Sequence, residues 1–302
     1  MTYQENLSED DYIIFLLHGV VERREHEVRN YNRKHIEESY FVDFLDRLLG
    51  AGGNPVSMDA VLDSHRSQRP LPPRSFAITF DDGFLNNLTL AAPILERYGI
   101  PATFYVTSDF IQSNRMSWID RVEWAVEAAD QGEVILPWRQ DRAFFKRASE
   151  KIAFLDEVRK FAKSAEGLDL DALASSIQKQ LGFDVTWSNG GALDQKMNWA
   201  QVKELNSRAL FTVGGHSHSH GILSFLSAAA LADELDTSLR MLWELAGIEP
   251  RHYSYPEGLA HCYSAGVIEQ LKKRGVEICP TAIFGKNNAQ TDPFELRRIM
   301  VT

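Results

Sequence analysis

Two clusters of ionisable side chains in this sequence have the types and spacing that metal binding and proton transfer require. The stretch "FAITFDDGFLNN" places Asp81 beside Asp82, directly after an apolar run that is typical of a buried strand. The stretch "GGHSHSHG" contains three histidines within five residues, and His216 and His220 are four positions apart. Two imidazoles at this spacing can face a single divalent ion. One carboxylate of the Asp pair would complete a three-ligand site with an open position for water, as catalytic metal sites have.

On this interpretation Asp82 binds the metal, and Asp81 remains beside it as a general base. Two further polar motifs follow apolar runs that resemble strands. His18 comes after "IIFLL", and the turn "YPEG", which contains Glu257, comes after "HYS". In parallel α/β barrels the reacting groups gather at the carboxyl ends of the strands, so these four motifs are expected at one rim.

Each motif also has a structural explanation. A single histidine such as His18 is often a hydrogen-bonded structural residue. An Asp-Asp-Gly tripeptide is often a turn that caps a helix, and "YPEG" is an ordinary turn sequence. Three histidines in five residues can also form a surface tract that binds metal fortuitously. The occurrence of all four motifs after strand-like runs favours a functional site.

Short apolar runs alternate with amphipathic stretches along the chain, and this order predicts a parallel sheet. The sequence therefore indicates an α/β fold, a distorted (β/α) barrel with about seven parallel strands. Amphipathic helical patterns without a clear strand predict a helical insertion at about residues 110–197. We expect residues 1–302 to form a single domain. The expected strands are 12–20, 75–80, 102–106, 210–215, 252–256 and 276–280.

The composition excludes several classes of function. The 302 residues carry a formal net charge of −10, which disfavours a nucleic-acid partner because neutralising phosphates needs clustered Lys and Arg. The acidic N-terminus lacks the features of a secretory signal, and no apolar run approaches the length of a membrane span. Two cysteines, Cys262 and Cys279, form no disulfide framework and suit a reducing compartment. We therefore expect a cytoplasmic protein, and a homo-oligomer remains open.

The motifs resemble those of the polysaccharide deacetylases of the NodB-homology type, carbohydrate esterase family four. "TFDDG" is similar to the first motif of that family, and "HSHSH" is similar to the second. "APILERYGIPATFYV" and "DPFELRRI" extend the resemblance over most of the chain. The resemblance implies Asp81 as general base and a metal site of Asp82, His216 and His220. It also implies that Ser217 braces the loop, and it assigns no role to His218.

The third motif departs from the family pattern. It is "SYPEG" here, with Tyr255, Pro256 and Glu257 at the positions that imply oxyanion and substrate contacts, the oxyanion contact coming from a backbone N–H near Glu257. The arginine that usually holds the catalytic Asp is missing from it, and Arg297 and Arg298 are the candidates to replace it. The late motif that supplies a general-acid histidine is also absent.

The branch that acts on poly-N-acetylglucosamine carries its acid histidine on the first strand. That similarity implies His18 as general acid. The implied reaction is metal-dependent removal of N-acetyl groups from an amino sugar or a polysaccharide precursor. Zinc is the expected ion, and cobalt, nickel or iron also suit two imidazoles and a carboxylate.

Three other functions remain open for this sequence. An amidase of the same fold would act on cyclic ureides or other small amides. A non-catalytic carbohydrate-binding relative would need no base beside an open metal. A non-haem iron oxygenase fits two histidines and one carboxylate, but it leaves the second Asp unexplained.

Overall fold

The computed structural model describes residues 3–188, 190–249 and 251–302, and the chain divides into two compact units. The first unit comprises residues 1–23, 35–114 and 196–302, and the second comprises residues 24–34 and 115–195. The second unit therefore covers most of the predicted insertion and also includes a short segment from near the N-terminus. The organisation as a single domain stays a prediction.

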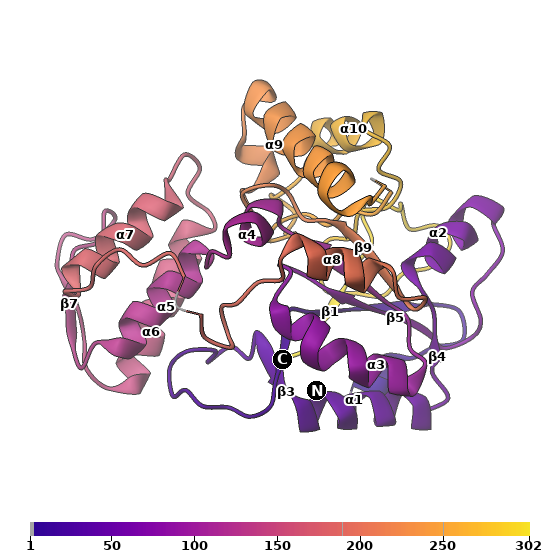
Figure 1. Ribbon diagram of the computed structural model, residues 1–302, viewed down its shortest axis with the longest axis horizontal. Coiled ribbons are helices and arrows are strands. Elements are labelled where there is room, and N and C mark those ends of the chain that lie inside the picture. Colours follow the sequence, from indigo (N-terminus) through magenta and orange to yellow (C-terminus); the bar gives the residue numbers. More distant parts are fainter. Residues whose placement is uncertain (1–2, 189, 250) are drawn as a thin grey trace. The chain divides into compact units, whose positions relative to one another are not determined.

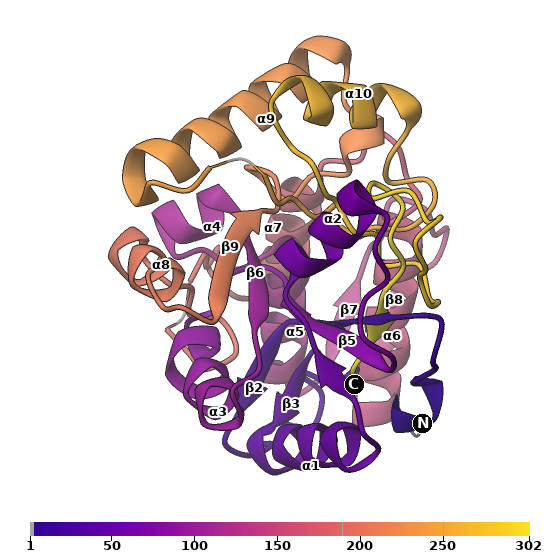
Figure 2. The ribbon, with the colours of Figure 1, turned by 90° about the vertical axis from the view of Figure 1, so that its right-hand side faces the viewer.

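A parallel sheet forms the centre of the first unit (Figure 2). The strands β1, β5 and β6 are buried at every position, which explains why their sequences are continuous apolar runs without alternation. The hydrogen-bonded order is β10 (Ile299–Met300), β1 (Ile13–Leu17), β5 (Ser75–Phe80), β6 (Ala102–Val106) and β9 (Phe211–Gly215), and β4 (Asn54–Pro55) pairs with the beginning of β5. The predicted α/β class with parallel strands is confirmed.

Beyond β9 the sheet continues only through isolated parallel bridges, which join Gly215 to Tyr253 and His252 to Ile278. The strands expected at 252–256 and 276–280 are reduced to these contacts. Among the described residues the pairing does not close into a complete barrel, so the distorted barrel is an open arc of six paired strands with an irregular continuation.

The first predicted strand, 12–20, is interrupted at His18. β1 ends at Leu17, and β2 (Gly19–Val21) pairs instead with β3 (His35–Glu37). Gly19 permits this change of partner, because a Cβ there would overlap the imidazole of His35. His18 therefore lies at the carboxyl end of β1 rather than inside a strand.

Helices of the first unit surround the sheet, and α1 illustrates how they do so. Phe41, Phe44, Leu45 and Leu48 recur at helical spacing and are all buried. In Figures 1 and 2, α9 and α10 lie side by side, away from α1 and α3. The α-helices are α1 (Glu38–Gly50), α2 (Met58–Ser67), α3 (Ala92–Tyr98), α4 (Ser108–Ser113), α8 (Trp199–Asn206), α9 (Ala228–Met241) and α10 (Ala265–Lys273). Short 3₁₀ or π turns are η1 (Tyr3–Asn6), η2 (Asn87–Ala91), η3 (Leu223–Phe225) and η4 (Leu242–Ala246).

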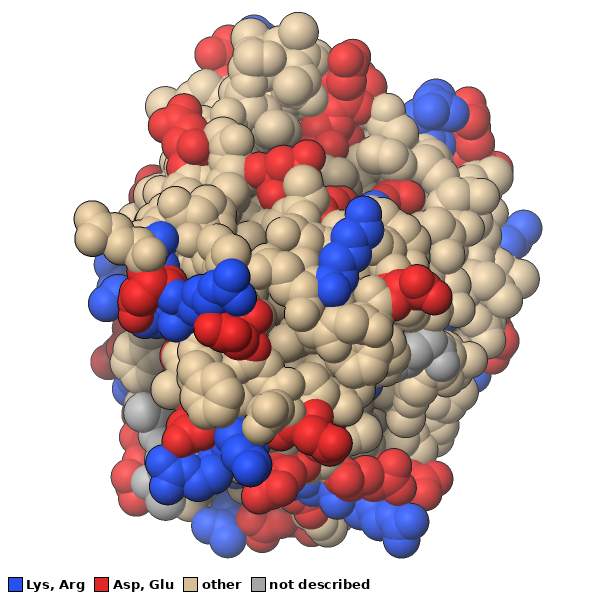
Figure 3. Space-filling view, turned by 90° about the vertical axis from the view of Figure 1, so that its left-hand side faces the viewer, with Lys and Arg blue, Asp and Glu red and all other residues tan. Residues whose placement is uncertain are grey.

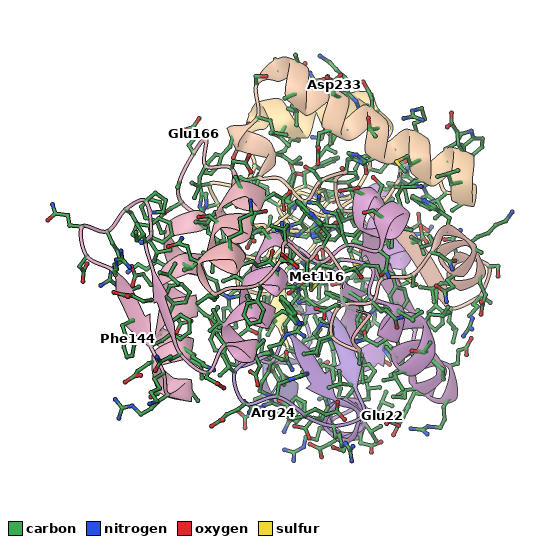
Figure 4. The ribbon with its side chains drawn as sticks, turned by 60° about the vertical axis from the view of Figure 1, so that its left-hand side comes forward. Glu22, Arg24, Met116, Phe144, Glu166 and Asp233 are labelled. Carbon is green, nitrogen blue, oxygen red and sulfur yellow. The ribbon has the colours of Figure 1, made fainter. Side chains whose placement is uncertain are left out.

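The second unit is largely helical and has an apolar core of its own. Its helices are α5 (Trp118–Ala128), α6 (Ala148–Ala162) and α7 (Leu170–Gln180). It also contains an antiparallel hairpin of β7 (Gly132–Val134) and β8 (Ala143–Phe145), which the helical patterns did not predict. In β8 the exposed Phe144 (Figure 4) stands between two buried residues, the period of two that marks a strand.

The segment 24–34 belongs to the second unit because the helix α5 supplies acceptors for its backbone. The carboxylate of Glu127 accepts hydrogen bonds of 2.8 Å from the N–H groups of both Val28 and Arg29. Such contacts between distant segments leave no periodic pattern, so they could not be predicted from the sequence.

Charged side chains of both signs are interspersed on the face shown in Figure 3. None of the helices in the described ranges combines the length and apolar character that a bilayer crossing requires.

Candidate metal and catalytic site

The register of the central sheet brings the polar motifs to one edge. Leu17 pairs with Phe80, so His18 and Asp81 are the next residues on neighbouring strands. The N–H of Asp81 donates to the carbonyl of Leu17 at 3.0 Å, and the N–H of His216 donates to the carbonyl of Val106 at 3.0 Å. Asp81 and His216 each follow a strand directly, and each is thus hydrogen-bonded to the neighbouring strand. Both lie at the carboxyl rim of the sheet, where the site was expected.

Asp82, His216 and His220 form the candidate metal site, with one ligand atom from each lying within 4.8 Å of the others. Asp82 Oδ1 is 3.3 Å from His220 Nε2 and 3.6 Å from His216 Nε2. Ligand atoms that share a tetrahedral ion at bonds of about 2.0–2.1 Å lie roughly 3.3 Å apart. The spacing therefore fits a common divalent ion, and the donor set of two imidazoles and a carboxylate suits zinc.

The imidazole of His216 is prepared for this role by its surroundings. Its Nδ1 lies 2.9 Å from the carbonyl oxygen of Ser254, a contact in which Nδ1–H donates and Nε2 is left to face Asp82. Burial lowers the pKa of His216, although the nearby Asp81 carboxylate acts in the opposite direction. The neutral form, which is the metal-binding form, is favoured.

Asp81 lies beside the candidate ligands and is held by Arg298. The guanidinium donates to both carboxylate oxygens, with Nη1 2.9 Å from Oδ1 and Nη2 2.8 Å from Oδ2. Both side chains are almost completely buried. Burial alone would raise the pKa of Asp81, but the charge of Arg298 and its hydrogen bonds hold it below its ordinary value. Asp81 is therefore ionised, as a general base must be.

Arg298 takes the place of the arginine that the third motif lacks. The adjacent Arg297 is exposed, so it is not the residue that holds Asp81. Arg298 also donates to the Thr281 carbonyl, the Thr79 hydroxyl and the Ser254 hydroxyl. The stretch "DPFELRRI" contains both arginines, but the sequence alone did not decide which of them contacts Asp81.

His18 follows β1 and is the sheet neighbour of Asp81. Its carbonyl accepts a hydrogen bond of 2.8 Å from the Asn87 side chain, and its imidazole is one of the groups whose charge lowers the pKa of Asp81. This placement brings the predicted acid and the predicted base to adjacent strand ends.

In the third motif the phenol of Tyr255 is buried and already bonded. The Tyr255 hydroxyl donates to the Phe294 carbonyl at 3.1 Å, and its ring stacks on Tyr263 with the centroids 4.6 Å apart. Burial raises the pKa of Tyr255 far above its ordinary value. The side chain of Tyr255 is thus part of the core. Pro256 is buried, and its carbonyl accepts the N–H of Gly258 at 2.6 Å, which closes the tight turn at Glu257.

Four residues of the site that are not glycine have left-handed backbone conformations. The φ angles are 75° at Asp82, 63° at Ser217, 64° at His220 and 58° at Glu257. Left-handed conformations cost energy for such residues and concentrate at functional sites. Here they occur in all three rim loops that follow β5, β9 and the 252–253 bridges.

The second-motif loop is braced by its own side chains. Ser217 Oγ accepts the N–H of His220 at 2.9 Å, as the resemblance implied. His218, to which the resemblance assigned no role, has its Nδ1 2.9 Å from the Ser108 hydroxyl. His218 therefore helps to attach the loop to the beginning of α4.

Comparison with known proteins shows the family to which this chain belongs. The family model described as polysaccharide deacetylase matches residues 68–140 and 171–279. The poly-beta-1,6-N-acetyl-D-glucosamine N-deacetylase of Escherichia coli is 25% identical over 248 residues, which cover 79% of this chain and 29% of that protein. The chain thus spans less than a third of the length of this curated relative.

Two solved structures share the fold. A Streptococcus pyogenes deacetylase, PplD, solved in complex with acetate, has a TM-score of 0.63 at 15% identity and covers 97% of this chain and 93% of its own. IcaB from Ammonifex degensii has a TM-score of 0.60 at 19% identity, over 98% and 94% of the two chains. Since the family model covers more than half of the sequence, the chain belongs to the polysaccharide deacetylase family.

Proposed function

We propose that this chain hydrolyses N-acetyl groups of an amino sugar within a glycan and that it needs a divalent metal to do so. The observation that carries the proposal is the spacing of Asp82, His216 and His220, with an ionised Asp81 beside them. A relative named as a deacetylase of poly-beta-1,6-N-acetyl-D-glucosamine supports the substrate class.

Asp82, His216 and His220 would hold the ion, and zinc is the ion we propose. When bound, a divalent ion supplies Lewis-acid activation of water and of the amide carbonyl. The buried, neutral His216 and the carboxylate of Asp82 are the donor types that such an ion takes at neutral pH.

Asp81 would accept the proton of the attacking water, because Arg298 holds the carboxylate ionised and fixes its plane. The negative charge that develops on the carbonyl oxygen would be bound in part by a backbone N–H at Glu257, which lies in a left-handed turn. His18 would donate a proton to the departing amine, which is a poor leaving group as an anion.

The proposal is tested by acetate release from N-acetylglucosamine oligomers, with cyclic imides as the competing substrates. We expect release by the zinc-loaded chain and none after chelation. His220→Ala should lose both zinc content and activity, whereas Asp81→Asn should retain zinc and lose turnover. Full activity of Asp81→Asn would show that the base is wrongly assigned, and turnover of cyclic imides alone would show that the substrate class is wrong.

The same assay examines His18. We expect His18→Ala to lose roughly 10²- to 10⁴-fold in turnover, the usual contribution of a positioned acid or base. A turnover close to that of the wild type would make His18 a structural residue of the β1 end.

The cytoplasmic location and the absence of a nucleic-acid partner stay predictions, and a homo-oligomer stays open.

A further inference from the structure

We infer that Glu234 of helix α9 is a positioning residue for the metal-binding loop, defined here as residues 216–220. The inference rests on the proposed function, because it concerns the loop that carries His216 and His220. Glu234 is not one of the candidate ligands. It contacts the loop through hydrogen bonds to the backbone and to Ser219.

The backbone N–H groups of the loop show why Glu234 matters. The N–H of His216 donates to Val106, and that of His220 donates to Ser217 Oγ. The N–H groups of His218 and Ser219 both donate to Glu234 Oε1, at 2.9 and 2.6 Å. Glu234 is thus the acceptor for the two peptide groups at the centre of the loop, between the two ligands.

The Ser219 hydroxyl strengthens this attachment. It lies 2.9 Å from Oε1 and 3.1 Å from Oε2 of Glu234, so both carboxylate oxygens are directed at the loop. A single carboxylate therefore fixes residues 218 and 219 as a unit.

The carbonyl side of the loop is fixed by a different segment. The Thr107 hydroxyl donates to the carbonyl of His216 at 3.0 Å. The N–H groups of Ser108 and Asp109 donate to the carbonyls of Ser217 and His218 at 3.1 and 3.0 Å. The loop is therefore held by three of its carbonyls to residues 107–109 and by the N–H groups of His218 and Ser219 to α9, where Glu234 accepts both of these N–H groups.

The loop needs this support because two of its residues are in left-handed conformations. Ser217 and His220 have φ angles of 63° and 64°, which an unsupported loop would relax. Relaxation would change the 3.3 Å separation of His220 Nε2 from Asp82 Oδ1. Groups that orient metal ligands in this indirect way typically change metal affinity by 10- to 100-fold.

The experiment measures zinc affinity of the full chain, stripped of metal and titrated with zinc against a chromophoric chelator. Glu234→Ala is expected to raise the dissociation constant about 10- to 100-fold. Glu234→Gln keeps an oxygen whose two lone pairs can accept both N–H groups, so its affinity should stay within about fivefold of the wild type. The matched control is Asp233→Ala, which removes the same charge from the neighbouring exposed position of α9 (Figure 4).

Thermal unfolding of the metal-free proteins shows whether each variant is folded. If Glu234→Ala does not fold, Glu234→Asp replaces it, because the shorter side chain withdraws the carboxylate from the loop while keeping the charge. It should bind zinc at least about tenfold more weakly than Asp233→Ala. An affinity equal to that of Asp233→Ala in Glu234→Ala, or in Glu234→Asp where Glu234→Ala does not fold, overturns the inference.

The two proposals fail in different ways. If the wild-type chain itself binds no zinc, the proposed metal dependence fails and the inference fails with it. If the wild type binds zinc and releases acetate while Glu234→Ala binds zinc equally well, only the role of Glu234 is overturned. A loss in Glu234→Gln as large as in Glu234→Ala would also overturn it, because charge rather than hydrogen bonding would then be the cause.

Discussion

The ion pair between Asp81 and Arg298 controls the charge of the proposed base. The two residues are 217 positions apart in the sequence, yet their side chains form a bidentate pair that is almost fully buried. A carboxylate at this depth would normally be protonated more readily. Arg298 reverses that tendency, so the activity of Asp81 depends on a residue outside its own motif.

Arg298→Ala should therefore shift the pH dependence of turnover. Removing the guanidinium raises the pKa of Asp81, and since the base must be ionised, the acidic limb of the pH–rate profile moves to higher pH.

The free energy of unfolding of Arg298→Ala should also fall, by about 3–5 kcal/mol at neutral pH, because a buried carboxylate loses its partner. The depressed pKa of Asp81 stabilises the fold above its unfolded pKa of about 3.9, and this contribution is lost as pH falls through the folded value.

The control for this change is Arg297→Ala, the neighbouring and exposed arginine. It should leave both the pH–rate profile and the urea midpoint close to those of the wild type. An unchanged acidic limb in Arg298→Ala would contradict the role given to the pair.

At the residue scale the sequence predicted which side chains meet but not everything that supports them. Asp82, His216 and His220 were recognisable because each lies in a short motif of unusual types. Arg298 was not separable from Arg297, since the choice depends on which of two adjacent residues faces the interior. Glu234 left no signal, because it acts on backbone N–H groups that any sequence possesses.

At the element scale, predictions succeeded where a strand is buried along its whole length. β5 and β6 were located from their apolar runs, with the bounds that the structure shows. The predictions failed where strand pairing is short, as in the hairpin of β7 and β8 and at the 252–253 bridges. Strands of two or three residues have too few alternations to show a period. Their pairing is decided by tertiary contacts.

β9 illustrates how closely the strands around the site approach one another. A Cβ at Gly214 would lie 2.6 Å from the His252 carbonyl oxygen and 2.9 Å from the Tyr105 ring. The backbone at His252 leads to Ser254, whose carbonyl orients His216. The close packing of β9 against residues 252–254 therefore helps to set the orientation of His216.

Gly214→Ala should push β9 away from the 252–254 segment. We expect a loss of about 1–3 kcal/mol in the free energy of unfolding, the usual cost of overpacking, measured by urea denaturation. Gly50→Ala is the matched control, since a Cβ at Gly50 in α1 meets nothing within 4 Å. Equal midpoints for the two variants would show that β9 adapts without cost.

At the scale of the whole molecule, the proposed ion would join segments that are remote in the sequence. Asp82 follows β5, and His216 and His220 follow β9, so an ion shared by them would connect two strands of the first unit. A ligand that binds only the folded state stabilises it in proportion to the logarithm of its concentration. Metal binding should consequently appear as a change in global stability.

Zinc at about 100 times its dissociation constant should raise the free energy of unfolding by about 2.7 kcal/mol. The measurement is thermal unfolding with and without zinc, and chelation should reverse the shift. His220→Ala should show no zinc-dependent shift at the same concentration. A shift of equal size in that variant would place the bound ion elsewhere in the molecule.

The left-handed turns at the rim also bear on how this chain could be engineered. Asp82, Ser217, His220 and Glu257 occupy backbone conformations that glycine adopts more readily than they do. A redesign that selected only for thermal stability would favour glycine at these four positions and would remove two of the candidate metal ligands, Asp82 and His220. Variants selected for robustness should therefore be checked at these positions first.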